Sequence, residues 1–138
     1  MIAKPTAGGD ILTEVGLRDF AAAEQAALSL VATDDEGKEI VYSDVCVTMG
    51  GPACFFPSLL GPNTPWNLNG SATPTAAVQN LLDQAAQLEA ARPVGSTATG
   101  IHLAMTQLYT TSRADMFLSG SLGKVTWAAD GNIASMSQ

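Results

Sequence analysis

The sequence predicts an α+β fold, and two observations carry that prediction. Apolar residues recur at helical spacing in the first third of the chain and again in residues 73–92. Residues 116–138 instead carry strand-forming side chains on both sides of Asp130-Gly131, which is typical of a β-hairpin. At 138 residues the chain has the size of one domain. We therefore expect a single domain, residues 1–138, built from helices and short strands.

The N-terminal part, residues 1–32, is predicted to be a strand followed by a helix. Residues 1–5 suit a short strand, and the segment around Gly8-Gly9 turns the chain. Thr13 is suited to cap the helix, and Glu14 lies in its first turn, where a negative charge complements the helix dipole. Five of six residues near helical spacing are apolar, which predicts one buried face: Leu17, Phe20, Ala21, Glu24, Leu28 and Val31. Residues 33–38 follow as a solvated turn.

The next segment, residues 39–60, contains both cysteines of the chain. It begins with a short extended piece at 39–42, and a helical turn is expected near residues 56–60. Cys46 and Cys54 flank a Gly-Gly-Pro turn, with seven residues between them. A pair of reduced thiols and a disulfide in an oxidising compartment both remain open on this evidence. The spacing does not suit a redox motif, and one histidine in the whole chain does not suit a metal site.

The second half of the chain begins with a loop at residues 61–72, which holds the glycosylation acceptor triplet at Asn69. Thr73 and Pro74 predict the start of a helix over residues 73–92, since Thr caps helices and Pro is favoured at the first position. A small-residue connector, 95–100, precedes a third, short helix near residues 101–109. The hairpin at 116–138 then closes the chain, and its second arm has no obvious backbone partners.

Charge and hydropathy exclude several classes of partner. The net charge is −7, and no basic stripe is available to neutralise phosphates, so neither nucleic acid nor an anionic membrane surface is expected as a partner. No apolar run reaches the roughly 18–20 residues of a membrane span, and the N-terminus does not resemble a signal peptide.

The residues do not predict an active site. His102 follows Ile101 and precedes Leu103, which is typical of a core or surface histidine rather than a general base. The 95–100 connector lacks the Lys-Ser/Thr pair of a phosphate loop, and the acids at 34–36 suit an exposed turn. We therefore expect no enzyme activity and no catalytic, cofactor or metal site.

Four segments together resemble a known family. They are residues 2–17, the helix that ends near residue 34, the Tyr42-Ser43-Asp44-Val45-Cys46 stretch with Cys54 and Ser58-Leu59-Leu60, and the hairpin from Phe117 to Ser135. In this order they resemble the first extracellular or lumenal domain of Patched and Niemann–Pick C type transporters, which carry a sterol-sensing membrane domain and belong to the resistance–nodulation–division superfamily. Gly120-Ser121 departs from the Gly-Gly pair of the family pattern, and residues 61–115 are generic.

The resemblance implies a partial ferredoxin-like, porter-type ectodomain with two main helices. It implies that the chain is a piece of a larger membrane protein, whose remainder and whose sterol or lipid cargo are the expected partners. It also implies that Cys46 and Cys54 form a structural disulfide, and that the domain lies on the extracellular or lumenal side. The expected role is sterol or lipid transport, or lipid-linked signalling. A free-standing secreted or surface binding module is the alternative.

Overall fold

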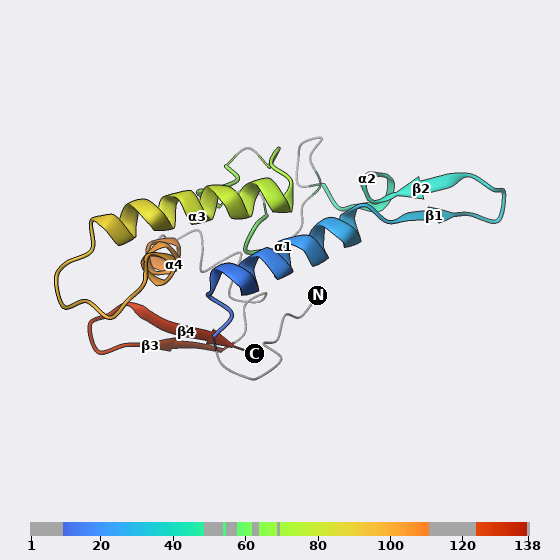
Figure 1. The fold of residues 1–138 in the computed structure, drawn as a ribbon. Helices are drawn as coiled ribbons and strands as arrows, with labels where there is room; N and C mark the ends of the chain where they lie inside the picture. Colours follow the sequence, from blue (N-terminus) through green and yellow to red (C-terminus); the bar gives the residue numbers. More distant parts are fainter. Residues whose placement is uncertain are drawn as a thin grey trace.

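The computed structural model describes residues 10–48, 54, 58–61, 64–68, 70–110 and 124–137. The elements run in the order α1 (Glu14–Leu28), β1 (Val31–Thr33), β2 (Glu39–Val41), α2 (Tyr42–Val45), α3 (Pro74–Ala90), α4 (Gly100–Thr110), β3 (Lys124–Trp127) and β4 (Ile133–Ser137) (Figure 1). The strands form two antiparallel pairs, β1–β2 and β3–β4. The expected α+β class is therefore confirmed for the described residues.

The core lies between α1, α3, α4 and the β3–β4 hairpin. Helix α3 packs against both α1 and α4, and α4 lies between α3 and the hairpin (Figure 1). Each element buries one apolar face, and the loop between α2 and α3 adds Leu59, Leu60 and Trp66. The least exposed large side chains are Leu12, Leu17, Leu60, Val78, Leu81, Met105, Ile133 and Met136.

Helix α1 begins where the sequence predicts and ends earlier than expected. The Thr13 hydroxyl accepts a hydrogen bond from the Gly16 amide at 3.0 Å, which confirms Thr13 as the N-cap. The prediction that the buried face continues to Val31 is wrong, because α1 ends at Leu28 and Val31 begins β1 with 55% of its surface exposed. The Ser29 hydroxyl donates to the Gln25 carbonyl at 2.7 Å, a local bond that competes with helix continuation. The strand expected at residues 1–5 lies outside the described residues.

Helix α3 follows the expectation closely. Thr73 is its N-cap and accepts from the Ala76 amide at 3.3 Å, and Pro74 is the first helical residue. The helix ends at Ala90, before Pro93, which has no backbone N–H to donate within a helix. Helix α4 at Gly100–Thr110 corresponds to the expected short third helix, and its first residue lies against α3. A Cβ at Gly100 would come within 1.9 Å of the Ala85 carbonyl oxygen, so only glycine fits this approach.

The C-terminal hairpin is confirmed between Lys124 and Ser137. Gly131 adopts a φ of 84° at its turn, a conformation that favours glycine. The expectation that the second arm lacks partners is wrong at Met136: its carbonyl accepts from the Ile11 amide at 2.9 Å, and its amide donates to the Asp10 carboxylate at 2.9 Å. The part of the expected hairpin before residue 124 lies outside the described residues.

The loop before α3 is held by one buried side chain. The Asn67 amide group donates to the carbonyls of Leu60 and Ala72 at 3.0 and 3.1 Å, and its oxygen accepts from the Ala72 amide at 3.0 Å. The adjacent Trp66 indole donates to the Leu59 carbonyl at 2.7 Å. The helical turn expected near residues 56–60 is, in its described part, a turn closed by a hydrogen bond from the Gly61 amide to the Ser58 carbonyl.

Candidate functional site

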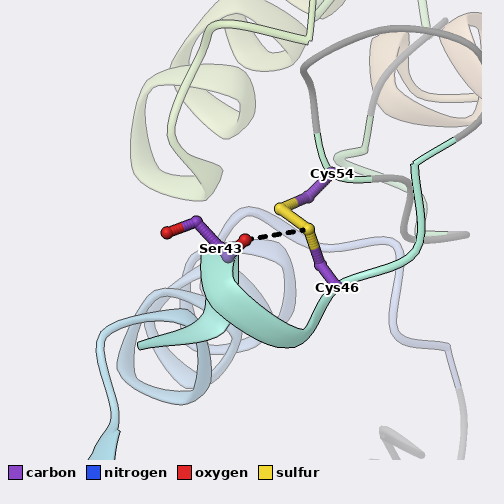
Figure 2. The surroundings of a disulfide bond; sticks show 3 residues. All are labelled: Ser43, Cys46 and Cys54. Atoms are coloured by element: carbon purple, nitrogen blue, oxygen red, sulfur yellow. Dashed lines mark hydrogen bonds between the residues drawn. A yellow bond between two sulfur atoms is a disulfide. The ribbon is translucent and has the colours of Figure 1, made fainter. Parts of the chain in front are cut away.

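The cysteine segment forms a disulfide between Cys46 and Cys54, the pair that the resemblance implies. The two Cα atoms are 5.5 Å apart, and Thr48 and Cys54 form an isolated antiparallel bridge beside the bond. Cys46 is the C-cap of the short helix α2, and its amide donates to the Tyr42 carbonyl at 3.0 Å. The Cys46 sulfur faces the Ser43 carbonyl oxygen (Figure 2), and the two atoms are 3.8 Å apart. A disulfide sulfur has no hydrogen to donate, so this is a packing contact.

The arrangement around the disulfide is architectural rather than reactive. Neither cysteine is a free thiol, and both are half-buried. The bond ties α2 to the segment that leads into the buried turn at Ser58. It therefore restricts the chain between the exposed β1–β2 hairpin and the core. The glycosylation acceptor predicted at Asn69 lies outside the described residues.

A second cluster joins segments that are far apart in the sequence. The His102 imidazole, on α4, has its Nε2 atom 2.5 Å from the Asp10 Oδ2 atom and its Nδ1 atom 2.5 Å from the Thr99 hydroxyl. The other Asp10 oxygen accepts from the backbone amides of Leu12 and Met136 at 3.0 and 2.9 Å. Asp10 thus connects the segment before α1 to α4 and to β4.

Thr106, one turn further along α4, extends this cluster. Its hydroxyl donates to the His102 carbonyl at 2.8 Å and accepts from the Ile133 amide at 2.9 Å. The C-terminal hairpin is therefore attached to α4 by Thr106 at Ile133 and to Asp10 at Met136. We call Asp10, Thr99, His102 and Thr106 the polar tie.

A hydroxyl, an imidazole and a carboxylate in series are also the parts of a nucleophilic triad. In this chain each part already has a structural partner. The Thr99 hydroxyl caps α4 by accepting from the His102 amide at 3.3 Å, and Asp10 holds two backbone amides. Only 13% of the His102 side chain and 22% of the Asp10 side chain are exposed. With its proton on Nε2, a neutral imidazole donates to Asp10 and accepts from Thr99, so the cluster is complete without a substrate.

One surface depression in the described part of the chain is lined by no residue of the polar tie. It is on α3 and is lined by Asn80, Asp83, Gln84, Gln87 and Leu88. Four of its five lining side chains end in an amide or a carboxylate, whereas small-molecule pockets are lined mainly by apolar side chains. His102 is not among the residues that line this depression.

Glu24 is the charged group that lies deepest in the described core. It projects from α1 and is only 7% exposed, and its Oε2 atom has no hydrogen-bond partner among the described residues. Burial raises the pKa of Glu24 above its ordinary value, because removal from water disfavours the charged form, while a hydrogen bond with the Ser58 side chain opposes that rise. Periodicity places Glu24 on the buried face of α1, but nothing in the local sequence indicates a partner for it.

The described residues were also considered for two further features, a metal site and a membrane-spanning helix. These residues contain no group of three or more His, Cys, Asp or Glu side chains arranged to hold a metal ion. None of the helices they form has the length and apolar content needed to cross a membrane.

No protein-family model, curated protein or solved structure matches the chain. The functional argument therefore depends on the residues and their geometry.

The polar tie is the feature that sequence reasoning missed. The sequence indicates His102 as an isolated histidine, and 92 residues separate it from Asp10. The nearest available signal was Thr99, three residues before His102, because Thr at that spacing is typical of a helix N-cap.

Proposed function

We propose that this chain is an ectodomain of a Patched or Niemann–Pick C type membrane protein, with a role in sterol or lipid transport or in lipid-linked signalling. The Cys46–Cys54 disulfide is the observation that carries its placement on the extracellular or lumenal side. Cytosolic proteins keep their thiols reduced, whereas small extracytoplasmic domains use disulfides to support their folds. The transport role rests on the sequence resemblance.

The positions of the two ends of the described chain support an inserted domain. Ile11 and Met136 are joined by a backbone hydrogen bond of 2.9 Å, so the two ends of the described chain lie close together. Domains whose ends lie close together are readily inserted into another chain. A domain held between two membrane-spanning helices needs this arrangement, because both ends must return to the same membrane surface.

We further propose that the β3–β4 hairpin is part of a larger ferredoxin-like, porter-type sheet. A sheet of two strands is marginal in water, and three or more strands are usual for independent stability. The rest of the protein would supply the further strands beside β3. Cys46, Cys54 and the polar tie then serve the architecture of the domain, and no catalytic step is assigned to it.

The decisive experiment is to sequence the transcript on both sides of residues 1–138. Runs of about 20 apolar residues before and after the segment are expected for a domain held between membrane helices. A start codon at Met1 together with a stop codon directly after Gln138 would refute the ectodomain proposal and favour a free-standing binding module.

Two measurements on the protein test its extracellular or lumenal placement and its sterol cargo separately. Mass spectrometry after alkylation should find no free thiol in protein recovered from the secretory pathway, and two modified cysteines would contradict the placement. A photoreactive sterol should label the whole membrane protein, and an excess of unlabelled sterol should reduce that labelling. Labelling that free sterol does not reduce would contradict the transport role without affecting the placement.

A further inference from the structure

The β1–β2 hairpin extends away from α3, α4 and the core (Figure 1). We call residues 30–47, which include both strands and α2, the arm. Strand β1 is exposed along its whole length, and the arm gathers exposed apolar side chains. Of the nine large apolar residues that are exposed in the described part of the chain, five lie in the arm: Leu30, Val31, Val41, Val45 and Val47. Such concentration of apolar surface is typical of an interaction site.

The two edges of the arm differ in their backbone hydrogen bonding. The Asp34 amide donates to the Lys38 carbonyl at 2.9 Å and closes the hairpin, and the strands pair Val31 with Val41 and Thr33 with Glu39. Hydrogen-bonded and non-hydrogen-bonded pairs alternate in an antiparallel ladder. Asp34 and Lys38 form the hydrogen-bonded pair that closes the hairpin. The Thr33–Glu39 and Val31–Val41 pairs are therefore non-hydrogen-bonded, and their amides and carbonyls point outward.

The outward edge of β2 is capped at Val41, whereas no described residue caps the outward edge of β1. The Val41 amide donates to the Asp44 carboxylate of α2 at 2.9 Å, which also confirms the outward direction deduced from the alternation. Helix α2 packs against β2, and β2 is the one element of the described chain that packs extensively against β1. An open edge of this kind presents donors and acceptors at Val31 and Thr33 that suit another strand.

The charge of the arm restricts which strand fits. Its acids are Asp34, Asp35, Glu36, Glu39 and Asp44, against the single base Lys38. A second copy of the chain does not complement this charge, since the described arginines, Arg18 and Arg92, already pair with Glu14 and Glu89. An anionic lipid surface or nucleic acid would be repelled. A basic polypeptide is the complementary partner.

We propose that the outer edge of β1 binds an extended segment of a separate protein in which apolar residues alternate with Lys or Arg. Backbone hydrogen bonds at Val31 and Thr33 align the added strand, its apolar side chains cover Val31, and its cations lie beside the acids of the turn. This inference holds whether the chain is an ectodomain or a free-standing module, because it uses only the arm.

The test is a titration of the whole, disulfide-bonded chain, labelled with ¹⁵N, with a short peptide of alternating Lys and Val. We expect saturable shifts and slowed hydrogen exchange at the Val31 and Thr33 amides, reduced by added salt. The same peptide with Glu for Lys, or with N-methyl groups on the amides that face β1, should not bind.

Three outcomes of this titration would overturn the proposal: shifts centred outside the arm, equal binding of the Lys and Glu peptides, or no binding. Concentration-dependent changes at these amides without peptide would assign the edge to a second copy and also overturn it.

Two variants sharpen the test. Thr33→Pro removes an outward amide without removing a ladder bond and should abolish binding, whereas Thr33→Val should retain it. Asp35→Asn combined with Glu36→Gln should weaken binding roughly tenfold at low salt, with Asp19→Asn on α1 as the matched control. Unchanged affinity in the double variant would overturn the charge argument. If Thr33→Pro unfolds the arm, the N-methylated peptide decides the role of the edge.

Discussion

Replacing Asp10 by alanine removes the carboxylate that connects the segment before α1 to α4 and β4. Three hydrogen bonds are lost: those from the Leu12 amide, the Met136 amide and the His102 imidazole. Each bond of a partly exposed group contributes about 1 kcal/mol net, so Asp10→Ala is expected to lower the free energy of unfolding by about 3 kcal/mol. That is a large part of the stability of an ordinary domain, which is roughly 5–15 kcal/mol.

Asp10→Asn separates the backbone bonds from the contact with the imidazole. The Asn oxygen still accepts from the two amides, and its amide group faces His102, whose ring proton moves to the Nδ1 atom and is donated to Thr99. Only the charge is lost, so the expected cost is about 1 kcal/mol. The order of stability is therefore wild type, then Asp10→Asn, then Asp10→Ala.

Urea unfolding followed by far-ultraviolet circular dichroism measures both differences, with the disulfide kept oxidised. Asp19→Ala is the control, because Asp19 is exposed on α1 and a surface change of this kind costs within about 0.5 kcal/mol. A free energy of unfolding for Asp10→Ala within about 0.5 kcal/mol of that for Asp19→Ala would refute the structural role of the polar tie.

Three further predictions follow from the core and the disulfide. Replacing Cys46 and Cys54 together by serine should lower the free energy of unfolding by about 2–3 kcal/mol on the chain-entropy estimate for so short a loop, measured by urea unfolding, and an unchanged midpoint would contradict the restraint. Glu24→Gln should stabilise the protein at pH 7 and have little effect near pH 4. The raised pKa of Glu24 means that the folded state binds the proton more tightly than the unfolded state, so wild-type stability falls as the pH rises above the ordinary value of 4.5. A difference in thermal midpoint that does not change with pH would contradict this. Gly100→Ala should lower the free energy of unfolding by at least about 1–3 kcal/mol, because the new Cβ meets the Ala85 carbonyl. A thermal midpoint equal to that of the wild type would contradict this, since it would show that α4 moves away without cost.

The features that the sequence predicts well are those fixed by neighbouring residues. Thr73 and Pro74 begin α3 because capping and the fixed φ of proline act within one turn. Asp130-Gly131 makes the hairpin turn because glycine adopts positive φ without strain. The amphipathic spacing in α3 identifies its buried face because α3 is long enough for the pattern to repeat.

The features that it predicts poorly depend on tertiary contacts or on very short elements. Val31 continues the helical spacing of α1, so periodicity assigns it to the helix, whereas pairing with Val41 places it in a strand of three residues. The hairpin has its own signal, a three-residue turn with Gly37 at a φ of 83°, between two short runs of strand-forming residues. No local pattern indicates that His102 meets Asp10, because that contact exists only once the helices and the hairpin have packed.

The two tryptophans lie in opposite environments, and this gives the chain its own pair of optical probes. Trp66 is 4% exposed in the core, whereas Trp127 is 50% exposed on β3, where its ring meets that of Tyr109 edge-on at 6.0 Å. Trp66 should emit at short wavelength until the core opens, and Trp127 should respond to detachment of the hairpin from α4. Two emission bands changing at different urea concentrations would reveal stepwise unfolding, in which the C-terminal hairpin leaves before the helices separate.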